Sequence, residues 1–346
     1  MTQSSDAIVP LGAMRFNSDS NKLEYWMGSA WFQIHTLSPN LDGGVRGIHG
    51  GGAATTINTI QFITISTQGN AVEFGDFPQR QYLTAATSSR TRGVWMGGYT
   101  NSPSSTYINS IQAVEMQSTG NGFDFGDLTQ TAGYNGITGN QTRAIRLGGT
   151  APVNPSTNVM DFVTITNQAN AVDFGDIGTG GGMSTNINSP TRGVFSVAYN
   201  NSIDFVTIAS TGNSQDFGFL TTEGKSLQEP RGACNAVRGI FAGGYRYPES
   251  PTGNVNIIQF ITIASTGNAT DFGDLVASMR VSAGTSSATR AVWLGGLAPS
   301  GVNTIQYVQI ATTGDAVDFG DTVETVYEGG ACSTGHGVSD NGNIKN

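Results

Sequence analysis

The acidic residue repeated most regularly in this chain is an aspartate that directly follows the pair Phe-Gly. Its five copies are Asp76, Asp127, Asp176, Asp274 and Asp321. Carboxylates repeated at one spacing could bind a metal ion or serve as acid and base in hydrolysis. They are explained more simply as turn residues, since a carboxylate can accept backbone N–H groups in the tight turn after glycine. We therefore expect a structural role for these aspartates.

A second repeated group is an arginine that opens an apolar strand. It occurs at Arg46, Arg92, Arg143, Arg192, Arg238 and Arg290. Guanidinium groups that face a common channel would collect anions. Guanidinium groups at the boundaries between repeats would instead bind acidic groups or carbonyls of the neighbouring repeat. We expect the second arrangement, a repeated clamp.

The remaining side chains offer little for catalysis. His35, His49 and His336 show no metal-ligand spacing and no His-Glu-x-x-His pattern. The chain also lacks a Gly-x-Ser-x-Gly nucleophile turn, a phosphate-binding glycine loop and a calcium loop. We expect no catalytic residue, no metal site and no cofactor, and hence a protein that is not an enzyme.

The repeated unit that carries these residues is clearest over residues 257–296. Its apolar run 257–263 is too short for a typical helix and rich in β-branched residues, so it predicts a buried strand. Gly267 and Asn268 predict a two-residue hairpin turn at positive φ. Three further strands are predicted at 271–274, 283–287 and 290–296. Four antiparallel strands in about 40 residues match the size of one propeller blade.

This unit occurs six times. Each copy is marked by an acidic residue followed by Phe-Gly, with the phenylalanine at Phe74, Phe125, Phe174, Phe217, Phe272 and Phe319. The five intervals average 49 residues, which falls at the kelch-sized end of the propeller range. We expect each phenylalanine to be a core wedge. The sequence predicts an all-β fold, a six-bladed propeller over residues 45–346 preceded by a small N-terminal β-meander.

The two ends of the repeat array are predicted to meet in one blade. A copy of the arginine strand precedes the first Phe-Gly at 45–51, and a poorer copy follows the last one at 334–338. Pairing the two ends would leave no open strand edge. A seventh blade would have to be built from the ends alone, which we do not expect.

Composition narrows the choice of partners and compartment. The net charge is −9, with only 16 Lys and Arg, which opposes binding of nucleic acid. No apolar run approaches the roughly 18 residues that a membrane span needs, so we expect no membrane insertion.

Cys234 and Cys332 each lie four positions before the residue that opens the next strand, Arg238 or His336. Equivalent positions in non-adjacent blades are too far apart to bridge, which predicts two reduced cysteines and synthesis in a cytosol.

Residues 1–44 lie outside the repeats. Apolar-aromatic runs at 14–17, 22–27 and 31–34 are separated by turn-forming residues, which predicts a three-stranded meander. A meander of this size cannot bury enough surface to stand alone. It either packs on the propeller as an edge patch or serves in attachment and oligomerisation, and its aromatic content favours the second role. The candidate attachment residues are Phe16, Tyr25, Trp26, Trp31 and Phe32.

The loops after the diglycine strands and after Phe-Gly-Asp should open on one face of the propeller, because successive strands reverse direction. These loops vary in length and content, whereas the Thr-Gly-Asn turns of the other face are nearly constant. Variable loops on a rigid scaffold are the usual place for recognition. The candidate binding residues are Tyr99, Tyr107, Tyr245 and Tyr247. The alternative is that these loops are tolerated variation without a function.

The repeats resemble two known groups of sequences. The diglycine strand and the Ile-x-Phe-Val-x-Ile strand resemble kelch-type propeller repeats over residues 45–340, with Phe where eukaryotic kelch repeats commonly have Trp. The motifs Thr-Gly-Asn-Ala-x-Asp-Phe-Gly-Asp and Ser-x-Thr-Arg-Gly-Val-Trp are similar to repeats in virion proteins of tailed bacteriophages. The segment Gly12–Trp31 is similar to a short segment of phage fibre and appendage proteins that tends to lie near a junction or trimeric element.

The resemblance implies a structural virion protein, a fibre or knob component made in the cytoplasm of a bacterial host. Residues 1–44 would bind other virion proteins, and a homo-oligomer, with a trimer favoured, would present the loops to a host-surface glycan or protein. One alternative is a head or tail decoration protein that binds only other virion proteins. A carbohydrate-active enzyme is a third reading, and it requires two carboxylates at a catalytic distance.

Overall fold

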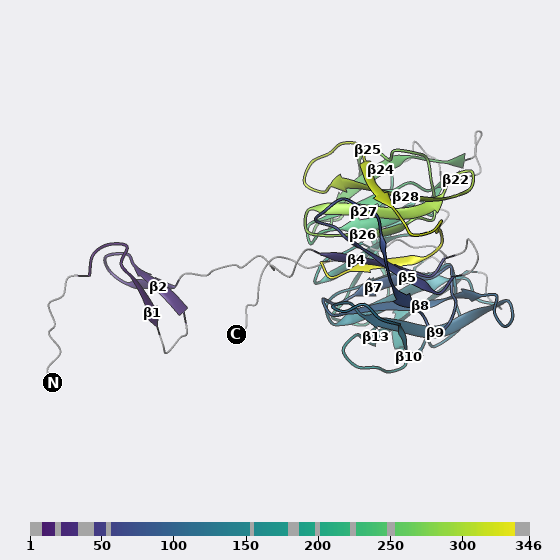
Figure 1. Cartoon of the computed structure of the whole chain (residues 1–346), viewed down its shortest axis with the longest axis horizontal. Helices are drawn as coiled ribbons and strands as arrows, with labels where there is room; N and C mark the ends of the chain where they lie inside the picture. Colours follow the sequence, from purple (N-terminus) through teal and green to yellow (C-terminus); the bar gives the residue numbers. More distant parts are fainter. Residues whose placement is uncertain are drawn as a thin grey trace. The chain divides into compact units, whose positions relative to one another are not determined.

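The computed structural model describes residues 9–17, 22–33, 45–52, 57–152, 156–178, 187–197, 201–221, 226–247 and 253–335. These residues form β-strands and no helix (Figure 1). Contacts divide the chain into two compact units, one formed by Met1–Asp42 with Gly342–Asn346 and the other by Gly43–Asn341. The two units are described separately below.

The first unit contains a three-stranded antiparallel meander, as predicted. Its strands β1 (Met14–Asn17), β2 (Lys22–Trp26) and β3 (Trp31–Gln33) pair in the order β1-β2-β3. Arg15 and Glu24 form an ion pair of 2.9 Å across β1 and β2. The Arg15 guanidinium also lies 4.2 Å from the centre of the Trp31 ring, so it joins all three strands.

The second unit contains six four-stranded antiparallel sheets and one sheet of three strands. Sheet 1 consists of β30 (Gly330–Ser333), β4 (Arg46–Gly50), β5 (Thr59–Thr64) and β6 (Val72–Asp76). Sheet 2 consists of β7 (Ala85–Ser88), β8 (Arg92–Thr100), β9 (Thr106–Glu115) and β10 (Phe123–Asp127). Sheet 3 consists of β11 (Gly136–Gly139), β12 (Arg143–Gly149), β13 (Thr157–Thr164) and β14 (Val172–Asp176).

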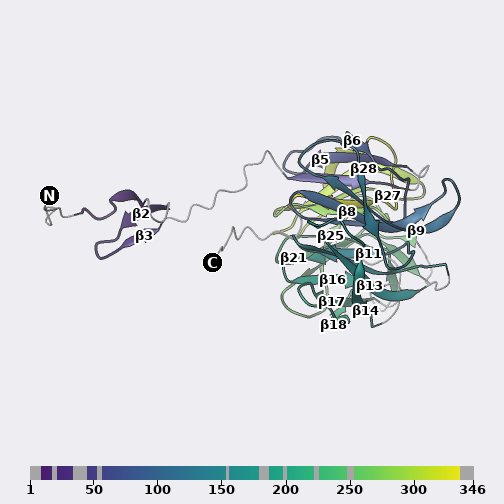
Figure 2. The ribbon, with the colours of Figure 1, turned by 90° about the horizontal axis from the view of Figure 1, so that it is seen from below.

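The remaining sheets follow the same order from first to fourth strand. Sheet 4 consists of β15 (Ile187–Asn188), β16 (Arg192–Ser196), β17 (Ser202–Thr207) and β18 (Gln215–Phe219). Sheet 5 consists of β20 (Arg231–Cys234), β21 (Arg238–Ala242), β24 (Ile257–Thr262) and β25 (Thr270–Asp274). Sheet 6 consists of β26 (Ala283–Ser286), β27 (Arg290–Leu297), β28 (Gly301–Gln309) and β29 (Val317–Asp321). The three-stranded sheet consists of β19 (Ser226–Gln228), β22 (Tyr245–Tyr247) and β23 (Gly253–Asn254). The hairpin of β8 and β9 extends beyond its neighbours (Figure 2).

The strands predicted within residues 257–296 are all present, but they do not form one sheet. β24 and β25 are the last strands of sheet 5, and β26 and β27 are the first strands of sheet 6. Residues 275–282 therefore cross from one sheet to the next. The prediction of a single blade over 257–296 is wrong, because an eight-residue connection can either fold back or cross over and the residues of the unit are the same in both cases.

The ends of the repeat array meet in sheet 1, as predicted. β30 pairs with β4 from Gly330 opposite Gly50 to Ser333 opposite Gly47. The closing strand precedes the expected range 334–338, of which residues 336–338 lie outside the described residues. The first strands of the sheets also contact each other in a series that returns to its start, in the order β7, β11, β15, β20, β26, β30 and β7 again.

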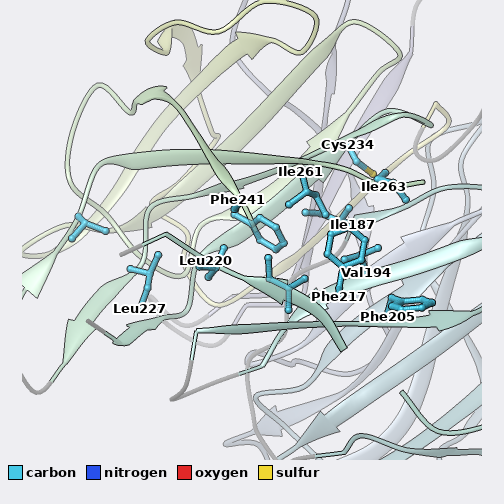
Figure 3. Close-up of a cluster of buried hydrophobic side chains, with 13 residues drawn as sticks. Ile187, Val194, Phe205, Phe217, Leu220, Leu227, Cys234, Phe241, Ile261 and Ile263 are labelled. Carbon is cyan, nitrogen blue, oxygen red and sulfur yellow. The ribbon is translucent and has the colours of Figure 1, made fainter. Parts of the chain in front are cut away.

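The hydrophobic core lies between the sheets. Six clusters of buried side chains each draw residues from two consecutive sheets, and the sixth joins sheet 6 to sheet 1. In the cluster between sheets 4 and 5, Ile187 and Phe217 lie against Phe241 and Ile261 (Figure 3). The six phenylalanines of the Phe-Gly motif are at most 4% exposed, which confirms their predicted place in the core.

Both cysteines are buried and reduced, as predicted. The prediction that Cys234 and Cys332 occupy equivalent positions in their sheets is wrong by one residue. Cys234 lies opposite Gly239, whereas Cys332 lies opposite Ile48 and therefore corresponds to Ala233. The shift arises because the second strand of sheet 1 comes from the start of the repeat array, so that His336 does not open it. Burial raises the pKa of the Cys332 thiol to about 12.

The strand-opening arginines join each sheet to the next, which confirms the predicted clamp. In every case Nη1 donates to a backbone carbonyl just after the third strand of the following sheet, at 2.8 to 3.1 Å. The pairs are Arg46 with Met116, Arg92 with Ile165, Arg143 with Ile208, Arg192 with Ile263, Arg238 with Ile310 and Arg290 with Ile65. The last pair returns to sheet 1.

A second repeated contact joins the Phe-Gly-Asp strand of one sheet to the Thr-Gly-Asn turn of the next. Gly267 N–H donates to the Phe217 carbonyl, and Asn268 Oδ1 accepts the Phe219 N–H. Gly218 can approach this turn because a Cβ there would lie 2.4 Å from the Gly267 carbonyl oxygen. The residue before Asn268 has a φ of 158°, near extended backbone, and Asn268 itself is not at positive φ. The predicted hairpin of β24 and β25 is present, but Gly267 and Asn268 do not form its two-residue turn. They connect sheet 5 to sheet 4 instead.

The aspartates after Phe-Gly act through the backbone at this connector. The N–H of Asp76, for example, donates to Asn121 Oδ1 of the next sheet. Within the residues that the structure describes, none of the five carboxylates accepts a hydrogen bond. The structural role expected for this position is confirmed, but the group responsible is the N–H rather than the carboxylate.

Replacing Arg290 by Met is expected to lower the free energy of unfolding by about 2 kcal/mol, because it removes a charged hydrogen bond between sheets 6 and 1. Urea unfolding of the full chain measures this change. Arg90→Met, in the exposed turn between β7 and β8, is the matched control and should change the free energy little. An equal effect of the two substitutions would contradict the clamp.

His49 makes sheet 1 sensitive to acid. The side chain is fully buried, neither ring nitrogen has a hydrogen-bond partner among the described residues, and burial lowers its pKa to about 4 from an ordinary 6.5. The folded state thus binds the proton less readily than the unfolded state. Stability should be lost as the pH falls below 6.5, by about 3 kcal/mol near pH 4.

This prediction is checked by urea unfolding of the wild type and of His49→Phe between pH 7 and pH 4. Phenylalanine is the residue that β16 and β21 carry at the equivalent position, as Phe195 and Phe241. The carboxyl groups titrate in both proteins, so the difference between the two curves isolates His49. Parallel curves would show that His49 does not carry the acid response.

Candidate functional site

One face of the second unit is formed by the segments that cross between sheets and by the loops after the diglycine strands. We call it the crossover face. The two kinds of segment contact each other, as the antiparallel order predicts: Gly98 N–H donates to the Ala132 carbonyl, and Gly296 N–H donates to the Val326 carbonyl. Side chains from different sheets are therefore brought together on this face.

The end of each described crossing segment carries a residue with a left-handed backbone. The equivalent positions are Leu83, Tyr134, Glu229, Val281 and Glu328, with φ between 50° and 59°. None is glycine, and such a conformation costs on the order of 1 to 3 kcal/mol for each residue. Backbone hydrogen bonds link these positions across sheets, from Tyr134 N to Leu83 O, from Leu83 N to Glu328 O and from Glu328 N to Val281 O.

The first strand of each sheet begins two residues later, and there Arg231 breaks the pattern. The other described equivalents are Ala85, Gly136, Ala283 and Gly330, all small. Arg231 lines a cavity of about 30 Å³ together with the beginnings of β7, β26 and β30. We call this cavity the inner-strand pocket. A long charged side chain therefore occupies a place that the repeat otherwise keeps small.

Some of the charged side chains around this pocket form ion pairs and others do not. Arg280 and Glu229 form an ion pair of 3.3 Å. The Arg231 backbone carbonyl accepts a hydrogen bond from Trp293 Nε1 at 3.1 Å. The Arg231 side chain makes no hydrogen bond or ion pair with the described residues, and its Nε is buried without a partner. Burial lowers the pKa of Arg231, opposed by the carboxylates of Glu229 and Glu328. Burial likewise raises the pKa of Glu328, opposed by the charge of Arg231.

Tyrosines surround these charges. The rings of Tyr82 and Tyr99 meet edge to face at 5.4 Å, and those of Tyr99 and Tyr107 at 5.0 Å. Burial raises the pKa of Tyr134 to about 12, with smaller contributions from Glu328 and other neighbours. Its hydroxyl therefore remains a hydrogen-bond donor at neutral pH. Tyr327 lies near enough to Tyr82 to affect the pKa of that hydroxyl.

Two of the predicted binding tyrosines are in direct contact in the described structure. Tyr99 and Tyr107 lie opposite each other on β8 and β9 and share a ring contact. Tyr245 lies on β22 beneath the guanidinium of Arg280, 4.7 Å from its ring centre. Tyr247 pairs through its backbone with Ser226, and its side chain lies outside the described residues.

The five candidate attachment residues divide between the two faces of the meander. Strand pairing places Phe16, Tyr25 and Phe32 on one face with Met14 and Leu23. Met14, Phe16, Leu23 and Phe32 are 60%, 63%, 37% and 49% exposed, so that this face is apolar and open within the first unit. Trp26 and Trp31 pack on the opposite face at 5.4 Å, beside the Arg15–Glu24 ion pair. The sequence run alone did not separate the two groups.

The sequence interpretation missed Tyr82, Tyr134, Glu229, Arg231 and Glu328. Alignment of the repeats could have identified Arg231. Alignment of the segments Leu83–Ala86, Glu229–Gly232 and Glu328–Ala331 shows a small residue at the third place, except for Arg231. The interpretation anchored the repeats on Phe-Gly and the diglycine, and this shorter segment between them was treated only as a strand.

Comparisons with known proteins leave the family open. No protein-family model matches the chain, and no curated protein matches it significantly. Among the described residues, no helix has the length and apolarity that a membrane crossing requires. The same residues contain no group of three or more His, Cys, Asp or Glu placed to hold a metal ion.

Arg231→Ala is expected to raise the free energy of unfolding by about 1 kcal/mol, because it removes a buried donor without a partner. Alanine fits the site, since Ala85 and Ala283 occupy it in sheets 2 and 6. Urea unfolding measures the change, and Arg92→Ala is the comparison that should lower stability through loss of a clamp. A loss of stability with Arg231→Ala would show that the side chain supports the fold.

Proposed function

We propose that the chain is a virion appendage protein of a tailed bacteriophage, in which a six-bladed kelch-like β-propeller binds a host-surface glycan or protein. The observation that carries this proposal is the crossover face, where tyrosines and unpaired charged groups from several sheets gather on a repeated scaffold. The meander would attach the protein to other virion proteins, as a homo-oligomer for which a trimer is favoured.

The propeller is supported by three sets of contacts that run through all six sheets. The arginine clamps, the hydrophobic clusters and the contacts of the first strands each return from sheet 6 to sheet 1. The strand β30 contributed by the end of the repeat array completes sheet 1. Sheets buried on both faces and joined in this way need no further layer.

Recognition is supported by the chemistry of the crossover face. Tyr82, Tyr99 and Tyr107 offer partly exposed rings that hold their position through mutual contact. Tyrosine gives contact area and a hydroxyl at little cost in conformational entropy. The left-handed residues nearby are strained in every sheet where the position is described, and such strain is typical of binding sites.

Attachment is supported by the open apolar face of the meander. Met14, Phe16, Leu23 and Phe32 leave much of their side chains exposed within the first unit. An apolar sheet face rimmed by polar residues favours a protein interface. The resemblance of Gly12–Trp31 to a segment of phage fibre and appendage proteins favours a virion partner.

The recognition half of the proposal is tested by adsorption of the labelled full chain to host cells. Replacing Tyr99 and Tyr107 together by Ala is expected to reduce adsorption at least tenfold, because it removes the paired rings. Tyr307→Phe is the matched control, since phenylalanine occupies this place in other sheets and the side chain packs on Phe319 away from the crossover face. Adsorption should be unchanged there.

The attachment half is tested in the same phage by deletion of residues 1–40, which should abolish incorporation into virions while residues 43–341 still fold. Normal incorporation would refute the role of the meander. No adsorption by the full chain would favour a decoration protein. Cleavage of host polysaccharide by the full chain would favour an enzyme.

A further inference from the structure

We infer that the inner-strand pocket and its rim form a saccharide subsite, in which Arg231 and Glu328 together hold two neighbouring hydroxyl groups of a neutral sugar. This inference rests on the proposed function and names the chemistry of the ligand. It adds two residues that the sequence interpretation did not consider for binding.

The size of the pocket limits what can enter it. A volume of about 30 Å³ accommodates one or two groups of the size of a water molecule. A sugar ring is far too large, so only its hydroxyl groups could reach Arg231. The ring itself would remain outside. Tyr82 and Tyr134 lie nearby, since Glu328 affects the pKa of both hydroxyls and Tyr134 N–H donates to the Leu83 carbonyl, next to the pocket residue Thr84.

The donors of Arg231 and the acceptors of Glu328 favour a ligand with two adjacent hydroxyl groups. Arg231 offers only donors and Glu328 offers only acceptors when ionised, and neither side chain has a hydrogen bond or ion pair among the described residues. Glu328 directly precedes the pocket residues Gly329 and Gly330, and its backbone carbonyl accepts the Leu83 N–H at the start of the segment that supplies Thr84 and Ala85 to the pocket. The charges of Arg231 and Glu328 influence each other's pKa without forming an ion pair. A hydroxyl both donates and accepts, so two adjacent hydroxyls can satisfy the guanidinium and the carboxylate at once.

The balance of charge favours a neutral ligand. Two guanidinium groups, Arg231 and Arg280, face two carboxylates, Glu229 and Glu328. An acidic sugar would leave one negative charge uncompensated at this partly buried site, and a cationic ligand would leave a positive one. A neutral sugar adds no charge and therefore leaves no charge uncompensated at the site.

The repetition of the chain supplies clean variants for the test. Arg231→Ala copies Ala85 and Ala283, and Glu328→Leu copies Leu83, which has nearly the same backbone angle of 55° against 59°. Both variants are therefore expected to fold, which thermal unfolding verifies. Arg90→Ala, in the turn between the first and second strands of sheet 2, serves as the surface control.

The experiment is titration calorimetry of the full chain with methyl glycosides of glucose, galactose and mannose, their deoxy analogues that lack one hydroxyl of each neighbouring pair, inorganic phosphate and glycine. We expect at least one neutral glycoside to bind, with affinity at least tenfold lower for its deoxy analogue and for both variants. Arg90→Ala should bind as the wild type does.

Three results would overturn the inference: no glycoside binds, the variants bind glycoside as well as the wild type, or phosphate or glycine binds in place of the glycosides. Its failure is separable from that of the proposed function, because cell adsorption is measured independently. Adsorption without glycoside binding removes only this inference. Glycoside binding without adsorption keeps the subsite and removes host recognition.

Discussion

The hydrogen bond from each strand-opening arginine to a carbonyl of the next sheet is the contact on which the repeated structure depends. A four-stranded sheet with both faces apolar cannot stay folded alone, so each sheet needs a neighbour on either side. The arginine also lies against an aromatic ring of its own sheet, as Arg238 does over Phe260 at 4.4 Å. One side chain therefore contacts both its own sheet and the next, and the six arginines together join every sheet to two neighbours.

The residues that differ from the repeat at equivalent positions are the most informative about function. At the centre of the second strand most sheets have an aromatic residue, but sheet 3 has Arg146 and sheet 1 has His49. Arg146 is fully buried and bonded to Asp161 at 2.7 Å, so its charge is satisfied inside the sheet. Arg231 is different because it lines a pocket and its buried Nε has no hydrogen-bond partner among the described residues. A buried charged side chain that lowers stability and forms no hydrogen bond or ion pair is best explained by binding of a ligand.

The sequence identified the strands well because each buried strand is a short β-branched run bounded by glycine. It also placed the chain ends in one sheet, since β4 copies the second strand of the other sheets. It did not reveal which strands share a sheet, because hairpin and crossing connections use similar residues. The Gly267-Asn268 pair was misread because its contact is with another sheet, and no local pattern reports that. Tyr99 and Tyr107 were found as isolated loop residues, whereas Arg231 and Glu328 come together only through the arrangement of sheets.

The state of the two cysteines bears on where the protein can persist. Both thiols are enclosed within the sheets, and the raised pKa of Cys332 keeps it in the form that reacts slowly with oxidants. Since no disulfide contributes to the fold, the stability of the protein does not depend on whether its surroundings are reducing or oxidising. Packing and hydrogen bonds between the sheets therefore carry the whole of that stability.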